Sequence, residues 1–142
     1  MSAKKRKIFF SSPAEDTVTH EVAQAQKDIL KSLIAQGTIV NGEHYLPASW
    51  WNNTSDDAFN ESIVALDEAN ILVAEVNEWS HSVGREIAYA QFVRKIPVLC
   101  LYKRGTKPSA MIEGNEELQV FPYETAEDIK GIVDNFFTHW LE

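Results

Sequence analysis

The residue best suited to chemistry in this chain is Glu86, which lies in a helical pattern running from about Val83 to Arg94. The apolar residues of this pattern recur on one face: Val83, Ile87, Ala90 and Val93. At 100° per residue Glu86 falls within that face, whereas Arg85 and Phe92 fall on the solvent side. A carboxylate that points to the core from the first turn of a helix suits a nucleophile or a base. The alternative is an acidic residue placed there because it favours the helix dipole.

Two short apolar runs flank this helical pattern, Ile71 to Ala74 before it and Pro97 to Leu101 after it. Each matches a strand that is buried on both faces. A strand, a helix and a strand in this space form a βαβ unit, which implies a parallel sheet and a right-handed crossover. Ligands of such sheets bind beyond the carboxyl ends of the strands, where loops lead into helices. The chain places these polar or small residues at that edge: Glu75, Asn77, Ser80, Ser82, Gly84 and Glu86.

The rest of the chain continues the same alternation. Three further strands are expected, at Lys7–Phe10, Thr38–Val40 and Leu118–Phe121. Helices are expected at Thr17–Gln36, ended by Gly37, at Ala58–Glu68 and at Ala126–Leu141, with a short helix or turn at Ser109–Gly114. This pattern predicts an α/β fold over residues 1–142: a single-domain flavodoxin/Rossmann-like three-layer sandwich with a five-stranded parallel sheet in the order 2-1-3-4-5. The longest irregular stretch, Asn41 to Asp57, contains Trp50-Trp51, which either cover a base or sugar as a lid or close one end of the core.

Composition narrows the classes of function. The chain has 142 residues, is 44% hydrophobic and carries a formal net charge of −8. So acidic a chain is a poor match for polymeric nucleic acid, which needs a basic face, but a single nucleotide phosphate can be held by backbone amides and hydroxyls. Cys100 is the one cysteine and falls mid-strand, so we expect it to pack in the core, and we expect no disulfide, metal or other cofactor.

The cellular compartment follows from what the sequence lacks. No apolar run approaches the roughly 20 residues of a membrane span, and there is no signal peptide. We therefore expect a soluble protein of the cytoplasm with no membrane association. The run Lys4-Lys5-Arg6-Lys7 is either a nuclear-localisation patch or a solvated N-terminus, so the nucleus stays open as a location.

The central stretch resembles a known family. The run AEVNEWSHSVGREIAYA, followed by KIPVLCLY, is similar to the nucleoside 2-deoxyribosyltransferase superfamily. It is closest to the 2′-deoxynucleoside 5′-phosphate N-hydrolase branch, whose members read AEV, a short loop with Ser, GVGYELGRA and KPVLCL. Further similarities extend the likeness over most of the chain in register: Ser109 to Gly114, which reads SAMIEG, Gly42-Glu43-His44, and Val120 to Tyr123.

The resemblance implies roles for several residues. Glu86 would attack the anomeric carbon and form a glycosyl-enzyme intermediate, which water resolves in the hydrolases and an acceptor base resolves in the transferases. Ser80 and Ser109 would contact the phosphate, with Ser109 reaching the site of a neighbouring subunit in a homodimer or higher homo-oligomer. Capping of the adjoining helices is the alternative role for both serines. The candidate substrate-binding set is Phe9, Ser11, Ser80, Ser82, Gly84 and Ser109.

Three departures from the family pattern bear on activity. The tyrosine that orients the nucleophile is replaced by the run Ile8-Phe9-Phe10, and a phosphate-binding arginine falls on Ala14. The aspartate that serves as general acid falls on Ser62, with Glu61 beside it as a candidate acid and Asp67 about a turn and a half further on. Each acid–base contribution is worth roughly 10²–10⁴ in rate.

These departures leave three interpretations open. The first is an N-glycosidase that converts a 2′-deoxynucleoside 5′-monophosphate into free base and deoxyribose 5-phosphate. The second is a deoxyribosyltransferase that exchanges bases between deoxynucleosides. The third is a catalytically silent relative that binds nucleotides or partners. The Ser-Ala-Met-Ile segment and Ser80 favour the first over the second, whereas the absent tyrosine and aspartate sustain the third.

If the chain is an enzyme, another group has to orient Glu86. The candidates are backbone amides around Gly84 and the hydroxyls of Ser11, Ser12 or Ser82. The apolar surroundings of Phe9 and Phe10 would then raise the pKa of the Glu86 carboxyl and move the pH optimum upward.

Overall fold

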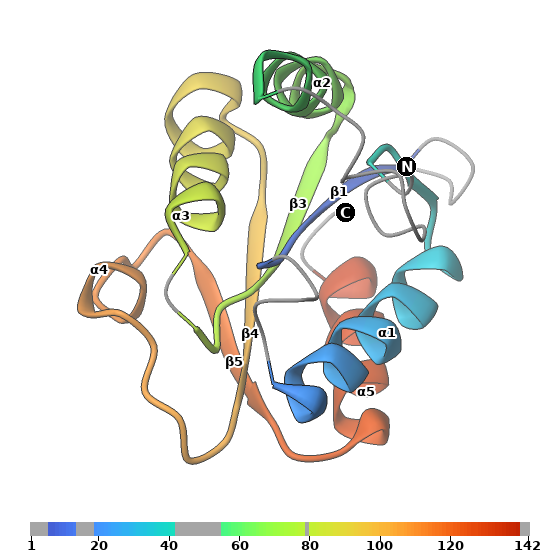
Figure 1. The fold of residues 1–142 in the computed structure, drawn as a ribbon. Coiled ribbons are helices and arrows are strands. Elements are labelled where there is room, and N and C mark those ends of the chain that lie inside the picture. Colours follow the sequence, from blue (N-terminus) through green and yellow to red (C-terminus); the bar gives the residue numbers. More distant parts are fainter. Residues whose placement is uncertain (1–5, 14–18, 42–54, 79, 140–142) are drawn as a thin grey trace.

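A five-stranded parallel sheet forms the centre of the computed structural model, which describes residues 6–13, 19–41, 55–78 and 80–139 (Figure 1). Its strands are β1 (Lys7–Ser11), β2 (Thr38–Ile39), β3 (Ile71–Glu75), β4 (Val98–Lys103) and β5 (Gln119–Tyr123). They lie in the order β2-β1-β3-β4-β5, and each neighbouring pair is parallel. The predicted fold class, strand order and central place of Ile71–Ala74 are therefore confirmed.

Helices cover both faces of the sheet (Figure 1). On one face lie α1 (His20–Ile34) and α5 (Ala126–His139). The other carries α2 (Ser55–Glu68) and α3 (His81–Ala88), which continues as the π-helix η4 (Tyr89–Arg94). The short helix α4 (Ala110–Glu113) lies between β4 and β5 in the chain. None of the helices in the described part of the chain is both long and apolar enough to cross a bilayer.

Two hydrophobic cores result, because successive strand residues point to opposite faces. Ile8 and Phe10 of β1 pack with α1 and α5, whereas Phe9 packs with α2 and α3. All five residues of β3 are buried, as expected for the middle strand of a sheet covered on both sides. Because β3 ends beside Ser11 of β1, its last residues and the loops that follow lie together at the carboxyl edge.

The helix around Glu86 differs from the expected one. It begins at His81, two residues earlier than Val83, because the side chain of Ser80 caps it. The prediction that Val93 lies on the buried stripe is wrong, since its side chain is 62% exposed. The π-helix η4 explains this outcome: its i→i+5 hydrogen bonding puts more residues in each turn, so positions after Tyr89 fall behind the 3.6-residue period. Ile34, the last residue of α1, is another exposed apolar side chain.

Glycine occupies position 37 for a different reason from the predicted one, which was to end the first helix. Helix α1 ends at Ile34 with Ala35 as its C-cap, and Gly37 does not adopt a left-handed conformation. A Cβ atom at Gly37 would lie 2.6 Å from the carbonyl oxygen of Arg6. Glycine is therefore required because the chain passes close to the start of β1 as it enters β2.

Several sequence predictions fall on residues outside the described ranges. These are the lid or core role of Trp50-Trp51, the basic residues Lys4 and Lys5, the Gly42-Glu43-His44 similarity, the arginine position at Ala14, and the ends of the first and last helices at Thr17 and Leu141.

Candidate active site

Glu86 is held by two serine hydroxyls from two different elements. The hydroxyl of Ser11, the last residue of β1, donates a hydrogen bond to its Oε1 at 2.8 Å. The hydroxyl of Ser62, on α2, donates to its Oε2 at 3.0 Å. Both serines are buried, so the two bonds fix the carboxylate in an environment with little water. The predicted inward direction of Glu86 is confirmed, and Ser11 is the one of its predicted partners that the structure brings to it.

Burial raises the pKa of the Glu86 carboxyl above its ordinary value. The hydrogen bonds from Ser11 and Ser62 act in the opposite direction, and so does the positive charge of Arg85. Desolvation is the largest of these effects, so the pKa moves upward as the sequence predicts. The carboxylate form therefore depends on the groups that stabilise its negative charge.

Arg85 is a residue beside the candidate nucleophile that the sequence does not predict as part of the site. Its Nη2 donates a hydrogen bond to the Ser62 oxygen at 3.3 Å, and the side chain is only partly exposed. Ser62 stands where the resemblance places an aspartate, and here it links a guanidinium to the candidate nucleophile. The helical pattern puts Arg85 towards solvent, and the bond to Ser62 depends on the packing of α2 against α3 and η4, which the sequence does not show.

A second carboxylate, Glu75, is completely buried at the end of β3. It accepts hydrogen bonds from the backbone N–H of Asn77 at 2.7 Å and from the hydroxyl of Ser12 at 3.2 Å. Ser12 in turn accepts a hydrogen bond from the Gln26 amide of α1. Burial raises the pKa of the Glu75 carboxyl, and these hydrogen bonds partly offset that effect. The sequence placed Glu75 at this edge but gave no sign of its partners.

Asn77 joins the carboxyl ends of three strands. Its amide group donates to the Tyr123 hydroxyl at 2.8 Å, and its carbonyl oxygen accepts from the backbone N–H of Lys103. The same oxygen accepts from the Thr106 hydroxyl at 3.2 Å. Burial raises the pKa of Tyr123 to about 12, so this phenol stays protonated at neutral pH. Asn77 therefore stabilises the loops that frame the edge.

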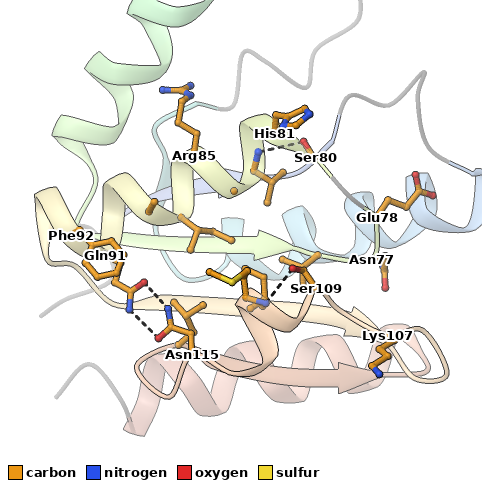
Figure 2. A pocket seen from close by; sticks show the side chains of 18 residues that line it. Asn77, Glu78, Ser80, His81, Arg85, Gln91, Phe92, Lys107, Ser109 and Asn115 are labelled. Carbon is orange, nitrogen blue, oxygen red and sulfur yellow. Dashed lines mark hydrogen bonds between the residues drawn. The ribbon is translucent and has the colours of Figure 1, made fainter.

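A cavity of about 440 Å³ lies between α3 with η4 and the segment around α4 (Figure 2). Ser80, Gly84, Lys107 and Ser109 contribute to its lining, as does Arg85. Figure 2 shows Ser80 and Ser109 on the two sides of the cavity, one beside α3 and the other beside α4. Glu86 is not among the lining residues, because its carboxylate is directed to Ser11 and Ser62.

The two serines that the resemblance assigns to the phosphate, Ser80 and Ser109, are helix caps, which is their alternative role. The oxygen of Ser80 accepts from the backbone N–H of Val83 at 3.3 Å, and that of Ser109 accepts from Met111 at 3.2 Å. A capping hydroxyl uses an acceptor lone pair, so its proton is available to a ligand. The exposed Ser82 lies 3.1 Å from the Ser80 oxygen.

The remaining predicted residues occupy different places. Phe9 is buried in the core beneath α2 and α3, where it supports the site without a polar contact. Glu61 is exposed on α2 beside Ser62, so its role as an acid stays a prediction. Asp67 accepts a hydrogen bond from the Tyr89 hydroxyl at 2.6 Å on the surface. Within the described ranges, no group of three or more His, Cys, Asp or Glu side chains is arranged to hold a metal ion.

Comparison with known proteins supports the family seen in the sequence. No family model matches the chain. A Methanosarcina mazei protein with the provisional name 2′-deoxynucleoside 5′-phosphate N-hydrolase 1 is 36% identical over 85 residues, covering 58% of this chain and 52% of that protein. The 5-hydroxymethyl-dUMP N-hydrolase of Rattus norvegicus is 36% identical over 81 residues, covering 54% of this chain and 48% of the rat protein. The predicted resemblance is confirmed.

The solved structures agree on the fold. The Clostridium botulinum CMP N-glycosidase superposes with a TM-score of 0.68, over 92% of this chain and 99% of that one, at 14% sequence identity. At that identity the similarity shows the shared α/β fold alone. The chain matches about half the length of the curated relatives, so what it acts on is argued from its own site.

Proposed function

We propose that this chain cleaves the N-glycosidic bond of 2′-deoxynucleoside 5′-monophosphates and releases free base and deoxyribose 5-phosphate. The observation that carries the proposal is the carboxylate of Glu86, held by Ser11 and Ser62 at the carboxyl edge of a parallel sheet. The names of the relatives, nucleotide N-hydrolases and a nucleotide N-glycosidase, support the same class of bond.

In the proposed reaction Glu86 is the nucleophile. Its carboxylate attacks the anomeric carbon as the bond to the base breaks, through an oxocarbenium-like transition state, and the base leaves with the bonding electrons. Water then cleaves the glycosyl ester and regenerates Glu86. Ser11 takes the orienting part that the resemblance gives to a tyrosine, because its hydroxyl points at Oε1 from the end of β1. Glu61 is the candidate acid that protonates the departing base.

The phosphate is proposed to contact two capping serines, Ser80 of one subunit and Ser109 of a neighbouring subunit. Both line the cavity beside α3, whose N-terminus adds a favourable dipole for an anion. Capping uses only the oxygen lone pairs, so each hydroxyl can donate to an anion, that of Ser80 when Ser82 is the donor in the hydrogen bond between the two. Ser109 is proposed to serve the Glu86 of a second subunit in a homodimer or larger assembly.

The test is incubation with a panel of deoxynucleoside monophosphates and deoxynucleosides, with free base followed by chromatography. We expect the wild type to release base from the 5′-phosphates and Glu86→Gln to release none. Glu127→Gln is the matched control, because Glu127 is an exposed residue of α5 on the opposite face of the sheet. Equal release by wild type and Glu86→Gln contradicts the assignment. Nucleotide binding without turnover in either protein indicates the silent relative, and exchange of an added base indicates the transferase.

A further inference from the structure

We propose that Arg85 is a positioning residue that acts through the Ser62 hydroxyl to hold Glu86 in its ionised form. The chain of contacts is Arg85 Nη2 to Ser62 Oγ at 3.3 Å and Ser62 Oγ to Glu86 Oε2 at 3.0 Å. The consequence for catalysis rests on the function proposed above, whereas the effect on Glu86 itself can be measured without turnover.

The direction of these two hydrogen bonds follows from the donors involved. A guanidinium group carries only donors, so Ser62 has to accept from Arg85. The one proton of the Ser62 hydroxyl is then free to point at Glu86. If Oε2 were protonated it would donate to Ser62, which would then accept two hydrogen bonds and could no longer direct its own proton at this oxygen. The relay therefore favours an unprotonated oxygen at this position.

The charge of Arg85 acts in the same direction. A cation near a carboxylate favours the ionised form, and within the protein this attraction is stronger than in water. Arg85 is the charged side chain among the described residues that lowers the pKa of Glu86, against the larger effect of burial. It therefore offsets part of the desolvation that accompanies a nucleophile in an apolar site.

The other elements packed around Glu86 do not supply an equivalent cation within the described ranges. Strand β1 contributes the neutral Phe9 and Ser11. Strand β3 contributes Glu75, whose carboxylate is turned to Ser12 and Asn77. Helix α2 contributes Ser62 and the exposed Glu61.

The experiment is a titration of the Glu86 carboxyl by carbon-13 NMR in the whole protein, with the signal assigned by its loss in Glu86→Gln. We expect Arg85→Gln to raise the titration midpoint, and Arg85→Lys, which keeps the charge, to restore it towards the wild-type value. Arg104→Gln removes the same charge from an exposed pair with Glu124 and should leave the midpoint unchanged. A midpoint in Arg85→Gln equal to that of the wild type overturns the proposal.

A double-mutant cycle tests the part played by Ser62. Ser62→Ala should itself raise the midpoint, and Arg85→Gln should have a smaller effect in that background than in the wild type. Fully additive shifts would show that Arg85 does not act through Ser62, and would contradict the proposal. If Arg85→Gln fails to fold, two variants still test the proposal. Arg85→Lys reports on the charge at this position, and Ser62→Ala reports on the hydrogen bond that links it to Glu86.

Kinetics separate this proposal from the proposed function. On the acidic side of its pH profile, kcat/KM of Arg85→Gln should fall a few-fold below wild type and should approach it at high pH, since the loss of a nearby cation favours the protonated carboxyl. A loss that is equal at every pH indicates a structural role and contradicts the proposal. A moved NMR midpoint in a protein that releases no base supports the role of Arg85 and contradicts the proposed function.

Discussion

Ser11→Ala should weaken catalysis most where Glu86 begins to protonate. The substitution removes one oxygen atom from a buried position at the end of β1, so it leaves the packing nearly unchanged, and it deletes the 2.8 Å hydrogen bond to Oε1 of Glu86. A hydrogen bond to a charged group contributes about 1.5–3 kcal/mol, and one to a neutral group about 1 kcal/mol. The difference, on the order of 1 kcal/mol, is what the ionised form loses relative to the protonated form.

That difference corresponds to roughly a five- to tenfold change in the proton affinity of Glu86, because about 1.4 kcal/mol is tenfold. At pH values on the acidic limb of the profile, kcat/KM of Ser11→Ala should therefore be lower than that of the wild type by about the same factor. At high pH, where Glu86 is ionised in both proteins, this pH-dependent part of the loss should disappear, and only the orienting effect of Ser11 should remain. The assay is base release from a deoxynucleoside monophosphate across the pH range, with the limb fitted for each protein.

The matched control is Ser32→Ala, which removes a hydroxyl on α1 whose hydrogen bond goes to the backbone of Asp28. It should leave the limb where it is. An acidic limb that does not move in Ser11→Ala would refute the claim that this hydroxyl stabilises the ionised form. A uniform loss at every pH would show that Ser11 orients the carboxylate without affecting its charge.

Three further predictions concern the edge of the sheet and the assembly. Burial raises the pKa of Glu75 above its ordinary value of 4.5 in the folded protein, so its contribution to stability is present below pH 4.5 and is lost as the pH rises through the folded-state pKa. In urea unfolding, the stability of Glu75→Gln should therefore fall less with rising pH than that of the wild type. Parallel curves for the two proteins would contradict this. Asn77→Ala leaves the Lys103 N–H without its partner and should lower the free energy of unfolding by about 1–3 kcal/mol. A change within about 0.5 kcal/mol, as for an ordinary surface substitution, would contradict this prediction. We expect a dimer or larger assembly in which Ser109–Gly114 lies near another subunit's Glu86. Light scattering tests whether the assembly forms, and a monomer at high protein concentration would count against it.

The fold could be predicted because its main signals are local. The apolar run Ile71–Ala74 and the helical spacing after it require nothing distant to be recognised, and the alternation of such segments sets the sheet order. The inward direction of Glu86 was also predictable, even though the helix begins at His81, because the periodicity between Val83 and Ile87 is unaffected by where the helix starts. Local patterns are thus sufficient for the scaffold and for the candidate nucleophile.

The remaining features depend on contacts between distant segments. The bonds from Ser62 to Glu86 and from Arg85 to Ser62 join residues of α2 and α3 that are more than 20 positions apart in the chain, so no local pattern predicts them. The exposure of Val93 follows from a π-turn that no composition signal marks. Gly37 is fixed by the passage of the chain near Arg6, not by the conformation of its own helix. For Ser62, Arg85 and Gly37, contacts between distant segments determine the outcome, not local propensity.

The most direct test of the central claim is to look for the covalent bond on Glu86. The protein is mixed with a deoxynucleoside 5′-monophosphate, quenched in acid during turnover and examined by mass spectrometry after digestion. We expect a deoxyribosyl 5-phosphate adduct on the peptide that contains Glu86, and neither adduct nor base release in Glu86→Gln, since an amide is not a competent nucleophile here. An adduct on another residue, or base release by Glu86→Gln at the wild-type rate, would contradict the account.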